Sequence, residues 1–324
     1  MNISLSNLNK KLICVTIGDI KGIGIHLLLK EFKKEKIKDF ILFTNINIFE
    51  KNIEFPKKKI NILNKINLKN YNKKKLNIYT FKTKNNDTNT MDSLKYAYEF
   101  TKKAIFIGIL TLPLNKYKIN KLVSKKFIDQ TSFFSNKEKQ RYSNMIFYYK
   151  NKFFIPLTIH IELKDVHKSF KNKVMMTKKI ENLHSTLLCD FKIKKPKMIL
   201  AGINPHAGEN KIISKDDDKY LLPIINKLKK RGILINGPIS GDGVINNENL
   251  RKYDAFIFTY HDQALIPFKI LSNYEGINYT SGLDVIRVSP SHGTAESLIG
   301  STKVISKGIV NCFKLIRKIN KNRN

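Results

Sequence analysis

Cysteine is scarce in this chain of 324 residues. The three cysteines, Cys14, Cys189 and Cys312, are odd in number and far apart in the sequence. A disulfide framework needs paired cysteines, and a thiolate metal cluster needs them at short spacing. We therefore expect neither feature and interpret the cysteines as reduced thiols.

Long hydrophobic runs are also missing. No stretch approaches eighteen uninterrupted apolar residues, and residues 1–11 lack the apolar core of a signal peptide. Hydrophobic residues still make up 42% of the chain, which is enough for folded cores, and the length suits about two domains. These features predict a soluble, cytoplasmic protein without a membrane partner.

Acidic residues are few. The chain has 26 Asp and Glu residues but 60 Lys and Arg residues, which gives a formal net charge of +34. Such an excess is typical of nucleic-acid-binding proteins, because basic side chains neutralise phosphates. Here, however, most basic residues are lysines spread along the whole chain among many Asn and Ile residues, all of which A/T-rich codons favour. No arginine-rich arm, zinc finger or aromatic RNA-binding strand accompanies the charge. We therefore predict no nucleic-acid partner, although the positive field attracts small anions.

Strand-like and helix-like segments alternate along the chain, which predicts an α/β fold with a largely parallel sheet. The predicted strands are 11–17, 40–43, 104–110, 145–149, 153–161, 198–202, 255–259 and 277–280. Helical periodicity marks 25–32, 92–103, 171–188 and 218–231. Residues 51–86, rich in Lys and Asn, are interpreted as a partly looped surface region, and 318–324 as a frayed end.

Histidine is rare, with seven residues, yet three of them lie in polar segments. His160 precedes Leu-Lys-Asp, His206 lies in Asn-Pro-His-Ala-Gly-Glu, and His261 lies in Tyr-His-Asp-Gln. Each is at or near the end of a predicted strand, where ligands bind in open α/β sheets. Three neutral imidazoles can hold a divalent metal and leave positions open for substrate. The pattern predicts a catalytic metal site, and the alternative for each histidine alone is a hydrogen-bonded or surface imidazole.

Three further polar residues follow His261 at intervals of nine: Lys269, Asn278 and Arg287. Two cations and an amide suit a phosphate monoester, because they offer charge-assisted hydrogen bonds to its oxygens. The alternative for Lys269 is an ordinary solvated lysine. Arg287 is more informative, because arginine is uncommon in this lysine-rich chain and this one lies between two apolar residues.

Two motifs point less clearly to a site. The turn from Gly18 to Gly24 resembles a phosphate-binding loop at a helix start, but its spacing differs from the dinucleotide fingerprint, and the alternative is a tight turn. Asp242 lies in a glycine-rich segment and is a candidate acid or base, with a structural turn role as the alternative.

In their order along the chain, these motifs resemble the 4-hydroxythreonine-4-phosphate dehydrogenase family of pyridoxal phosphate biosynthesis. The segments that carry the resemblance span nearly the whole chain: 16–24, 111–116, 160–166, 201–210, 237–238, 260–263 and 286–295. Asn-Pro-His-Ala-Gly-Glu-Asn and Tyr-His-Asp-Gln are the most specific of them, and the glycine turn is the least specific.

The resemblance implies an α/β/α sandwich like isocitrate and isopropylmalate dehydrogenases, with two subdomains and a cleft. The first subdomain is expected at 1–129 plus 288–324, and the second, with the metal and substrate residues, at 130–287. The resemblance also implies a homodimer with active sites at the interface. One divalent ion per site, zinc, magnesium or cobalt, is expected on His160, His206 and His261 from both subunits.

The implied activity is NAD-dependent oxidation of 4-phosphooxy-L-threonine with decarboxylation to 3-amino-2-oxopropyl phosphate. Substrate-binding positions of the family match Thr131, Lys269, Asn278 and Arg287, and we expect Asp242 and Lys269 to act in catalysis. Two alternatives stay open: a related dehydrogenase for threonate or erythronate 4-phosphate, and a degenerate, non-catalytic member.

This sequence departs from the family pattern in two places. Where the family has Gly-His-Thr-Glu, this chain has Asp-Gln-Thr-Ser, so Gln130 stands in place of a histidine that the family places against the substrate. A glutamine side chain forms hydrogen bonds but carries no proton at neutral pH. We therefore expect Gln130 to orient substrate, with Asp242 or metal-bound solvent taking the proton, or the activity to be reduced. Residues 211–217 also differ from the family's glycine and acidic pattern.

Overall fold

The computed structural model describes residues 11–301 and 305–324, which form two compact α/β units. Unit 1 contains the chain up to Lys139 together with Leu283–Asn322 and Asn324. Unit 2 contains Gln140–Gly282 and Arg323. Residues 1–10, part of the segment expected to lack a signal-peptide core, lie outside the described residues, as do 302–304.

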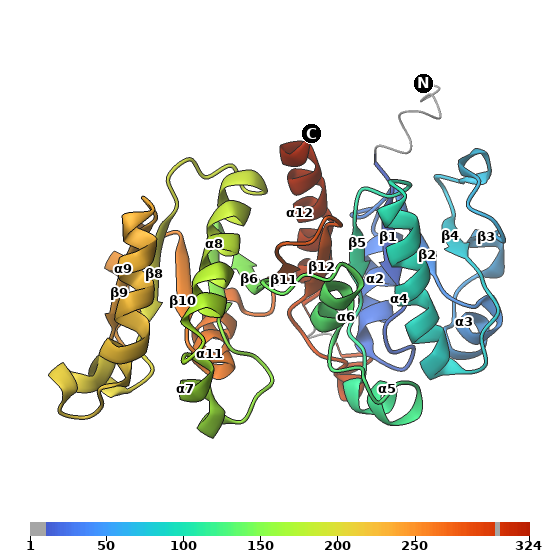
Figure 1. Ribbon diagram of the computed structural model, residues 1–324. Helices are drawn as coiled ribbons and strands as arrows, with labels where there is room; N and C mark the ends of the chain where they lie inside the picture. Colours follow the sequence, from blue (N-terminus) through green and yellow to red (C-terminus); the bar gives the residue numbers. More distant parts are fainter. Residues whose placement is uncertain (1–10, 302–304) are drawn as a thin grey trace. The chain divides into compact units, whose positions relative to one another are not determined.

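Unit 1 has a parallel sheet in the strand order β3-β4-β2-β1-β5-β12 (Figure 1). The strands are β1 (Ile13–Thr16), β2 (Phe40–Phe43), β3 (Ile60–Leu63), β4 (Leu76–Tyr79), β5 (Ile109–Thr111) and β12 (Arg287–Pro290). The helices are α2 (Ile23–Lys33), α3 (Ile46–Asn52), α4 (Asn86–Lys102), α5 (Lys116–Leu122), α6 (Gln130–Lys137) and α12 (Lys307–Arg323). Short 3-10 turns are η1 (Lys57–Lys59), η2 (Leu68–Asn70) and η6 (Glu296–Leu298).

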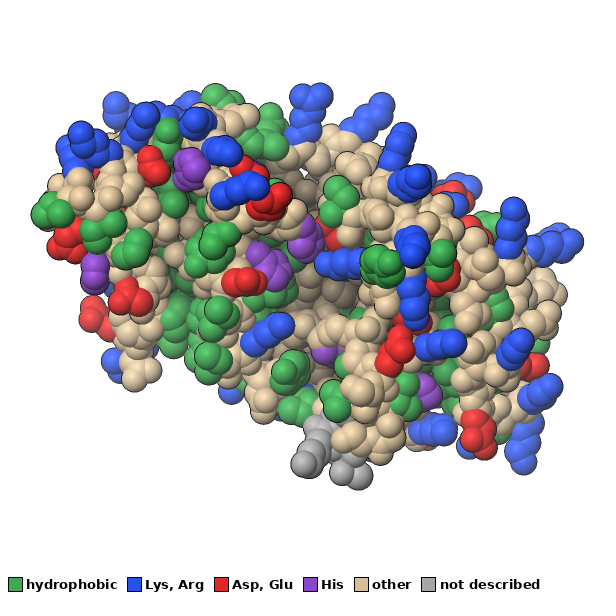
Figure 2. Space-filling model, turned by 90° about the horizontal axis from the view of Figure 1, so that it is seen from below, with side chains coloured by type: hydrophobic (Ala, Val, Ile, Leu, Met, Phe, Trp, Pro, Cys, Tyr) green, Lys and Arg blue, Asp and Glu red, His purple; other side chains and the backbone are tan. Residues whose placement is uncertain are grey.

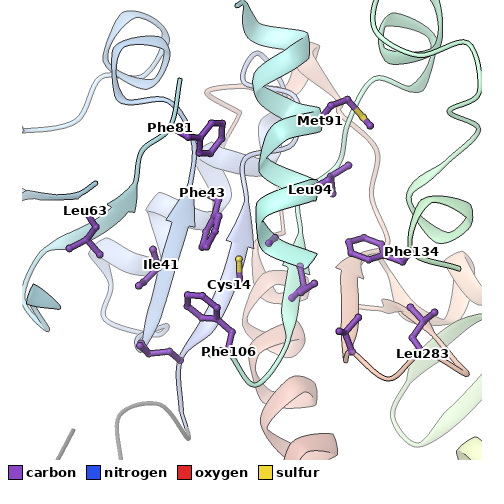
Figure 3. Close-up of a cluster of buried hydrophobic side chains, with 14 of the residues drawn as sticks. Cys14, Ile41, Phe43, Leu63, Phe81, Met91, Leu94, Phe106, Phe134 and Leu283 are labelled. Atoms are coloured by element: carbon purple, nitrogen blue, oxygen red, sulfur yellow. The ribbon is translucent and has the colours of Figure 1, made fainter. Parts of the chain in front are cut away.

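Helices cover both faces of the unit 1 sheet, because its central strands are apolar on both sides. On one face, Cys14 and Phe43 pack against Leu94 of α4 (Figure 3). On the other face, the ring of Phe40 lies 5.5 Å from the ring of Phe313 in α12 and also contacts α2. Successive side chains of each strand thus point to opposite faces of the sheet and pack into two separate cores.

Unit 2 has a mixed sheet in the order β11-β6-β7-β10-β8-β9, in which only β6 is antiparallel to its neighbours among the described strands. The strands are β6 (Met145–Tyr149), β7 (Lys152–Pro156), β8 (Lys197–Ala201), β9 (Leu234–Ile239), β10 (Ala255–Phe258) and β11 (Ile277–Thr280). The helices are α7 (Val166–Ser169), α8 (Lys173–Cys189), α9 (Leu222–Lys230), α10 (Asn247–Lys252) and α11 (His261–Ser272). Tighter or irregular turns are η3 (Leu163–Asp165), η4 (Pro205–Lys211) and the π-helical η5 (Asp217–Leu221).

Aromatic side chains fill both faces of the unit 2 sheet. Phe154 of β7 and Phe256 of β10 stack at 5.4 Å between ring centroids and pack against Phe268 of α11. Phe153, the neighbour of Phe154, points to the opposite face and contacts Phe191, just beyond α8, at 4.5 Å. Unit 2 is therefore also a sheet between helices, and the largely parallel α/β fold predicted from the sequence is confirmed.

One prediction about local structure is incomplete and another is wrong. Residues 51–86 contain β3 and β4, whose inward residues, such as Ile60 and Ile78, are buried while lysines occupy exposed positions around them. Because lysines surround these short strands in the sequence, the composition of the region did not indicate them. Residues 318–324 are not frayed, because α12 continues to Arg323 and Ile319 is fully buried.

The boundaries between the units differ from the expected 129/130 and 287/288. The chain passes from unit 1 to unit 2 after Lys139 and returns before Leu283. Phe134 of α6 belongs to the hydrophobic cluster of unit 1, and Arg287 begins β12, which pairs with β5. Packing of α6 and pairing of β12 therefore place the predicted substrate-binding residues Gln130, Thr131 and Arg287 in unit 1.

All three cysteines are free, as predicted, and Cys14 and Cys312 are buried. No helix in the described ranges is both long and apolar enough to cross a membrane.

Candidate active site

The three predicted metal ligands, His160, His206 and His261, follow three neighbouring parallel strands of unit 2. These strands are β7, β8 and β10, which lie side by side in the order β7-β10-β8. Because parallel neighbours run in the same direction, their carboxyl ends lie at one edge of the sheet. The loops that carry the histidines therefore begin at the same edge, as the sequence predicts.

Side-chain hydrogen bonds tie these three strand ends together. The hydroxyl of Thr158, after β7, donates to the carbonyl oxygen of Thr259, after β10, at 2.7 Å. Gln263 Oε1 accepts from the backbone N–H and the hydroxyl of Thr259, both at 2.9 Å. Gln263 Nε2 donates to the carbonyl oxygen of Gly202, after β8, at 3.1 Å. The glutamine of the Tyr-His-Asp-Gln motif thus fixes the turn before His261 against the turn that leads to His206.

His160 and His261 are brought close together. Their ring centroids are 5.7 Å apart, with 40° between the ring planes. Asp262 Oδ1 lies 2.6 Å from His261 Nδ1, so the carboxylate can orient that imidazole and fix its tautomer. His160 has a backbone φ of 53°, a left-handed conformation that is uncommon for residues other than glycine. Such local strain is found more often at functional sites than elsewhere.

His206 lies on a left-handed turn formed by the Asn-Pro-His-Ala-Gly-Glu motif. Residues 206–210 all have positive φ, from 44° at Glu209 to 85° at Gly208. A Cβ atom at Gly208 would lie 2.4 Å from the carbonyl oxygen of Ser214, so only glycine fits there. The turn leaves the His206 side chain exposed, with Nδ1 3.9 Å from Glu209 Oε2.

Asp217 forms hydrogen bonds with the residues that precede this left-handed turn. Its carboxylate is fully buried and accepts hydrogen bonds from the backbone N–H of Ile203 at 2.7 Å and from Asn204 Nδ2 at 2.9 Å. It also accepts from the backbone N–H of Asn204 at 3.3 Å. The segment 211–217, which departs from the family pattern, thus ends on the residue that fixes the His206 loop.

A cavity of about 670 Å³ opens beside His206 in unit 2. Its lining includes the polar side chains of His206, Asp242 and Asp262 and the apolar side chains of Ile266 and Ile270 on α11. A cavity of this size and mixed lining suits a small ligand with both charged and apolar parts.

Asp242, a predicted catalytic residue, is exposed at the rim of this cavity. A hydrogen bond from the Ser240 hydroxyl, followed by bonds from nearby backbone N–H groups, lowers the pKa of Asp242 below its ordinary value. The proximity of His206 lowers this pKa further. Asp242 is therefore a carboxylate at neutral pH, and a lowered pKa makes it a weak proton acceptor.

A single chain supplies only some of the side-chain ligands that a divalent metal ion needs. Imidazole nitrogens are good ligands for such ions, and the rings of His160 and His261 are near enough for both to reach one ion. Across residues 11–301 and 305–324, however, no group of three or more His, Cys, Asp or Glu side chains is arranged to hold a metal ion. Within one chain the geometry thus offers a pair of imidazoles, with His206 on the neighbouring loop.

Lys269 and Asn278, predicted to bind substrate, also lie in unit 2. Lys269 is exposed on α11, two turns after His261. Asn278 lies on β11, and its Oδ1 atom is buried without a hydrogen-bond partner in the described part of the chain. A buried acceptor without a partner has a free-energy cost, which a donor on a bound ligand would remove.

Arg287, at the start of β12 in unit 1, is 2% exposed and makes several hydrogen bonds. Its Nε and Nη2 donate to the hydroxyl oxygen of Thr111 at 3.0 and 2.8 Å. Nη1 donates to Thr131 Oγ1 at 3.4 Å, and Nη2 donates to Gln130 Oε1. Burial lowers the pKa of Arg287 to about 10, and the Asp129 carboxylate opposes this effect. Arg287 therefore stays cationic at neutral pH.

The glycine turn from Gly18 to Gly24 uses its backbone amides internally. Asp19 N donates to Pro113 O at 2.8 Å, Gly22 N to Asp19 O at 2.9 Å, and Ile23 N to Thr294 O at 2.8 Å. These N–H groups are not directed at a phosphate. These hydrogen bonds are typical of a tight turn before α2, which is the alternative interpretation of the sequence.

Two functional candidates were not identified from the sequence. Asp217 is one of three consecutive aspartates, and nothing in that run distinguishes the buried one. Lys179 of α8 has an ammonium enclosed by protein that donates to the carbonyl oxygen of Leu157, at the end of β7. Desolvation lowers the pKa of Lys179 to about 8. In a chain so rich in lysine, no sequence signal separates Lys179 from its neighbours.

Polar side chains at the carboxyl ends of parallel strands, beside a cavity, are the usual place of a ligand site in an α/β protein. Residues 30–316 match the family of pyridoxal phosphate biosynthetic protein PdxA, and the chain belongs to this family. The predicted family and fold class are thereby confirmed.

Individual relatives agree with this assignment. The chain is 32% identical over 332 residues to 4-hydroxythreonine-4-phosphate dehydrogenase of Aquifex aeolicus, covering 96% of this chain and 99% of the relative. It is 27% identical to the protein of that name from Bacteroides thetaiotaomicron, covering 90% and 84%. A crystal structure of 4-hydroxythreonine-4-phosphate dehydrogenase from Klebsiella pneumoniae has a TM-score of 0.81 at 23% identity, covering 96% and 98%, and shares the fold. Since the relatives are named dehydrogenases, the chain is an oxidoreductase.

Proposed function

We propose that this protein oxidises 4-phosphooxy-L-threonine with NAD and decarboxylates the product to 3-amino-2-oxopropyl phosphate, in pyridoxal phosphate biosynthesis. The full-length similarity to proteins named 4-hydroxythreonine-4-phosphate dehydrogenase supports this substrate. The observation that carries the proposal is the pair of imidazoles, His160 and His261, held 5.7 Å apart at the carboxyl edge of the unit 2 sheet.

We propose that His160, His206 and His261 hold a divalent ion (zinc, magnesium or cobalt), with ligands from two copies of the chain. A bound divalent ion supplies Lewis acidity at the substrate hydroxyl, and bound NAD supplies the hydride acceptor. Asp262 keeps the His261 imidazole oriented, and Gln263 and Asp217 hold the loops of His261 and His206 in place.

The charged and amide side chains are proposed to bind the phosphorylated amino acid. Lys269 and Arg287 carry positive charge for the phosphate, and the Asn278 side chain can donate to a phosphate oxygen through Nδ2. The unpartnered Oδ1 of Asn278 can then accept a hydrogen bond from an ammonium or hydroxyl group of the substrate. Because its pKa is lowered, Asp242 orients donors on the substrate more readily than it removes a proton.

We further propose that the protein is a homodimer. Two residues on one side of α11, Ile266 and Ile270, are 62% and 76% exposed, and Tyr274 just after the helix is 52% exposed. Positions four apart on a helix lie on one face, so these side chains form an apolar surface, part of which lines the cavity. An exposed apolar surface next to a polar site favours contact with another protein chain.

No nucleic-acid partner is proposed. On the face shown in Figure 2, Lys and Arg side chains are spread over the surface with Asp and Glu between them. A nucleic-acid-binding protein concentrates such charge along a groove or patch. Tight binding to DNA or RNA at physiological salt, with a steep salt dependence, would contradict this.

The test of the proposed function is NADH formation by the purified protein with 4-phosphooxy-L-threonine, with and without a chelator. We expect substrate-dependent NADH absorbance that the chelator abolishes and added zinc, magnesium or cobalt restores. Threonate and erythronate 4-phosphates are run in parallel, since preference for either would support the related dehydrogenase instead. Absence of NADH with every phosphate ester would support a non-catalytic member.

A further inference from the structure

Gln130 is the first residue of α6, and its side chain makes three hydrogen bonds inside unit 1. Oε1 accepts from the hydroxyl of Thr111 at 3.0 Å and from Nη2 of Arg287. Nε2 donates to the carbonyl oxygen of Leu112 at 3.0 Å. The residue is only 9% exposed, so water does not easily replace these partners.

These partners fix the direction of the Gln130 amide. A flipped amide would place its NH₂ group against the guanidinium of Arg287 and its oxygen against the carbonyl oxygen of Leu112. Both contacts would pair like with like and leave buried groups unsatisfied. The amide oxygen therefore faces Arg287, and both of its lone pairs are used.

A histidine at this position could not make the same contacts. A neutral imidazole has one acceptor nitrogen, which serves one of the two donors, Thr111 or Arg287, but not both. A protonated imidazole has no acceptor and would bring a second cation against the buried guanidinium. The glutamine avoids both problems, because its amide does not titrate near neutral pH.

We propose that Gln130 is a positioning residue, whose uncharged amide orients the Arg287 guanidinium toward an anionic group of the substrate without adding a group that titrates near neutral pH. This inference rests on the proposed function only in taking Arg287 as an anion-binding residue. It assigns no proton transfer to residue 130.

Two titratable side chains act on Arg287 from the neighbouring elements. The Asp129 carboxylate, at the N-terminal cap of α6, favours the charged form of the arginine. The thiol of Cys312 in α12 is fully buried, which raises its pKa so that it stays neutral at physiological pH. Replacing Gln130 with histidine would therefore add a group that titrates near neutral pH to this environment.

The experiment compares the wild type with Gln130→Met, Gln130→His and the control Asn136→His, an exposed position on the same helix. Binding of 4-phosphooxy-L-threonine is measured by titration calorimetry from about pH 5.5 to 8.5, a range that spans the ordinary pKa of histidine. Circular dichroism confirms folding of each variant. Because the phosphate group itself titrates near pH 6, the quantity compared is the ratio of variant to wild-type Kd at each pH.

We expect Gln130→Met, which keeps the volume but removes the acceptor, to weaken binding about tenfold at every pH, a change of about 1.4 kcal/mol. Gln130→His should bind with a ratio that grows as pH falls, because protonation places a cation beside Arg287. Asn136→His should match the wild type throughout. In turnover assays the Gln130 variants should raise KM more than they lower kcat, as expected for lost binding.

Binding by Gln130→Met within about twofold of the wild type would overturn the inference, since a tenfold change is expected for a lost buried acceptor. A Gln130→His ratio that is constant with pH would overturn it as well.

If the wild type binds the ester but forms no NADH, the proposed function fails while the binding ratios still decide the role of Gln130. If Gln130→Met does not fold, the pH dependence of Gln130→His decides alone. If the wild type binds neither the ester nor inorganic phosphate, the inference fails with Arg287 as its anion site.

Discussion

At the scale of single residues, a small number of buried polar side chains control the candidate site. Asp217 and Gln263 bind backbone and side-chain groups of the loops that they hold, whereas Gln130 acts on the guanidinium of Arg287. Each is satisfied by short hydrogen bonds within the protein. Removing one partner would leave the other buried and unpaired, which costs more than the bond itself contributes.

His261→Ala is expected to abolish or strongly weaken metal binding, because it removes one of the two imidazoles that lie 5.7 Å apart. We expect the affinity for zinc to fall by at least about tenfold, measured by equilibrium dialysis and metal analysis. His167→Ala, a histidine on α7 outside the site, is the control and should keep wild-type affinity. Equal zinc binding by both variants would contradict the assignment of His261.

Lys179 gives a prediction for the pH dependence of stability. Desolvation lowers its pKa from 10.5 to about 8, so the unfolded chain binds this proton more strongly than the folded protein does. The resulting destabilisation is fully present below pH 8 and disappears as pH rises toward 10.5. Lys179→Met should therefore increase the free energy of unfolding at pH 7 by roughly 1–3 kcal/mol. Loss of the hydrogen bond to Leu157 offsets part of this gain.

The measurement for Lys179 is urea unfolding of wild type and Lys179→Met at several pH values. The difference between them should shrink above pH 8, while other titrating groups cancel in the comparison. Lys178→Met, on the exposed side of the same helix, should show little change at any pH, because exposed ion pairs contribute little. A difference between Lys179→Met and wild type that does not vary with pH would refute the assigned cause.

At the scale of elements, the strand-end loops matter more than the strands. The left-handed turn of η4 and the start of α11 carry two of the three histidines, and both depend on hydrogen bonds between loops. A turn with several positive φ values is costly for residues other than glycine, so it persists only where its surroundings hold it. The buried carboxylate of Asp217 contributes to that restraint by fixing Ile203 and Asn204 at the start of the loop.

Asp217→Asn tests this restraint. An asparagine has one acceptor oxygen where the carboxylate offers two, so the backbone N–H of Ile203 or the amide of Asn204 loses a partner. We expect a loss of about 1–3 kcal/mol in the free energy of unfolding and weaker metal binding through His206. Asp218→Asn, the partly exposed neighbour that pairs with Lys211, is the control and should change stability little. Unchanged metal affinity in Asp217→Asn would show that the turn holds without it.

At the scale of the whole molecule, each unit is a sheet between helices, and each contains some of the predicted site residues. His160, His206 and His261 belong to unit 2, whereas Gln130 and Arg287 belong to unit 1. The formal charge of +34 gives the protein a general attraction for small anions.

Ile270→Lys tests the proposed homodimer. Ile270 is 76% exposed on α11, so a lysine there should be tolerated by the fold of the isolated chain. In an apolar dimer contact, the same lysine would bury an unpaired charge and shift the protein toward monomer. Light scattering after size-exclusion chromatography should show a dimer for wild type and mostly monomer for the variant. Ile62→Lys, at an exposed position of unit 1, is the control, and a monomeric wild type would refute the proposal.

Much of the fold could be predicted from the sequence, because alternating apolar strands and periodic helices report burial directly. The segments around β1, β2, β6, β8 and β10 have runs of apolar residues that are buried on both faces. The strands β3 and β4 were missed because they are only four residues long and lie among lysines. The sequence around α12 was equally misleading, since its polar residues surround a buried apolar stripe.

By itself, the sequence determined the family, the α/β class and the residue types available for chemistry, because motifs and hydrophobic periodicity are local properties of the chain. Tertiary structure alone decided which of those residues meet. It paired the ring of His160 with that of His261, buried one aspartate of three beneath the His206 turn, and directed the amide oxygen of Gln130 at Arg287. These contacts join segments 14 to 157 residues apart, such as Ile203 with Asp217 and Gln130 with Arg287, so they depend on strand order and loop packing that no local pattern specifies.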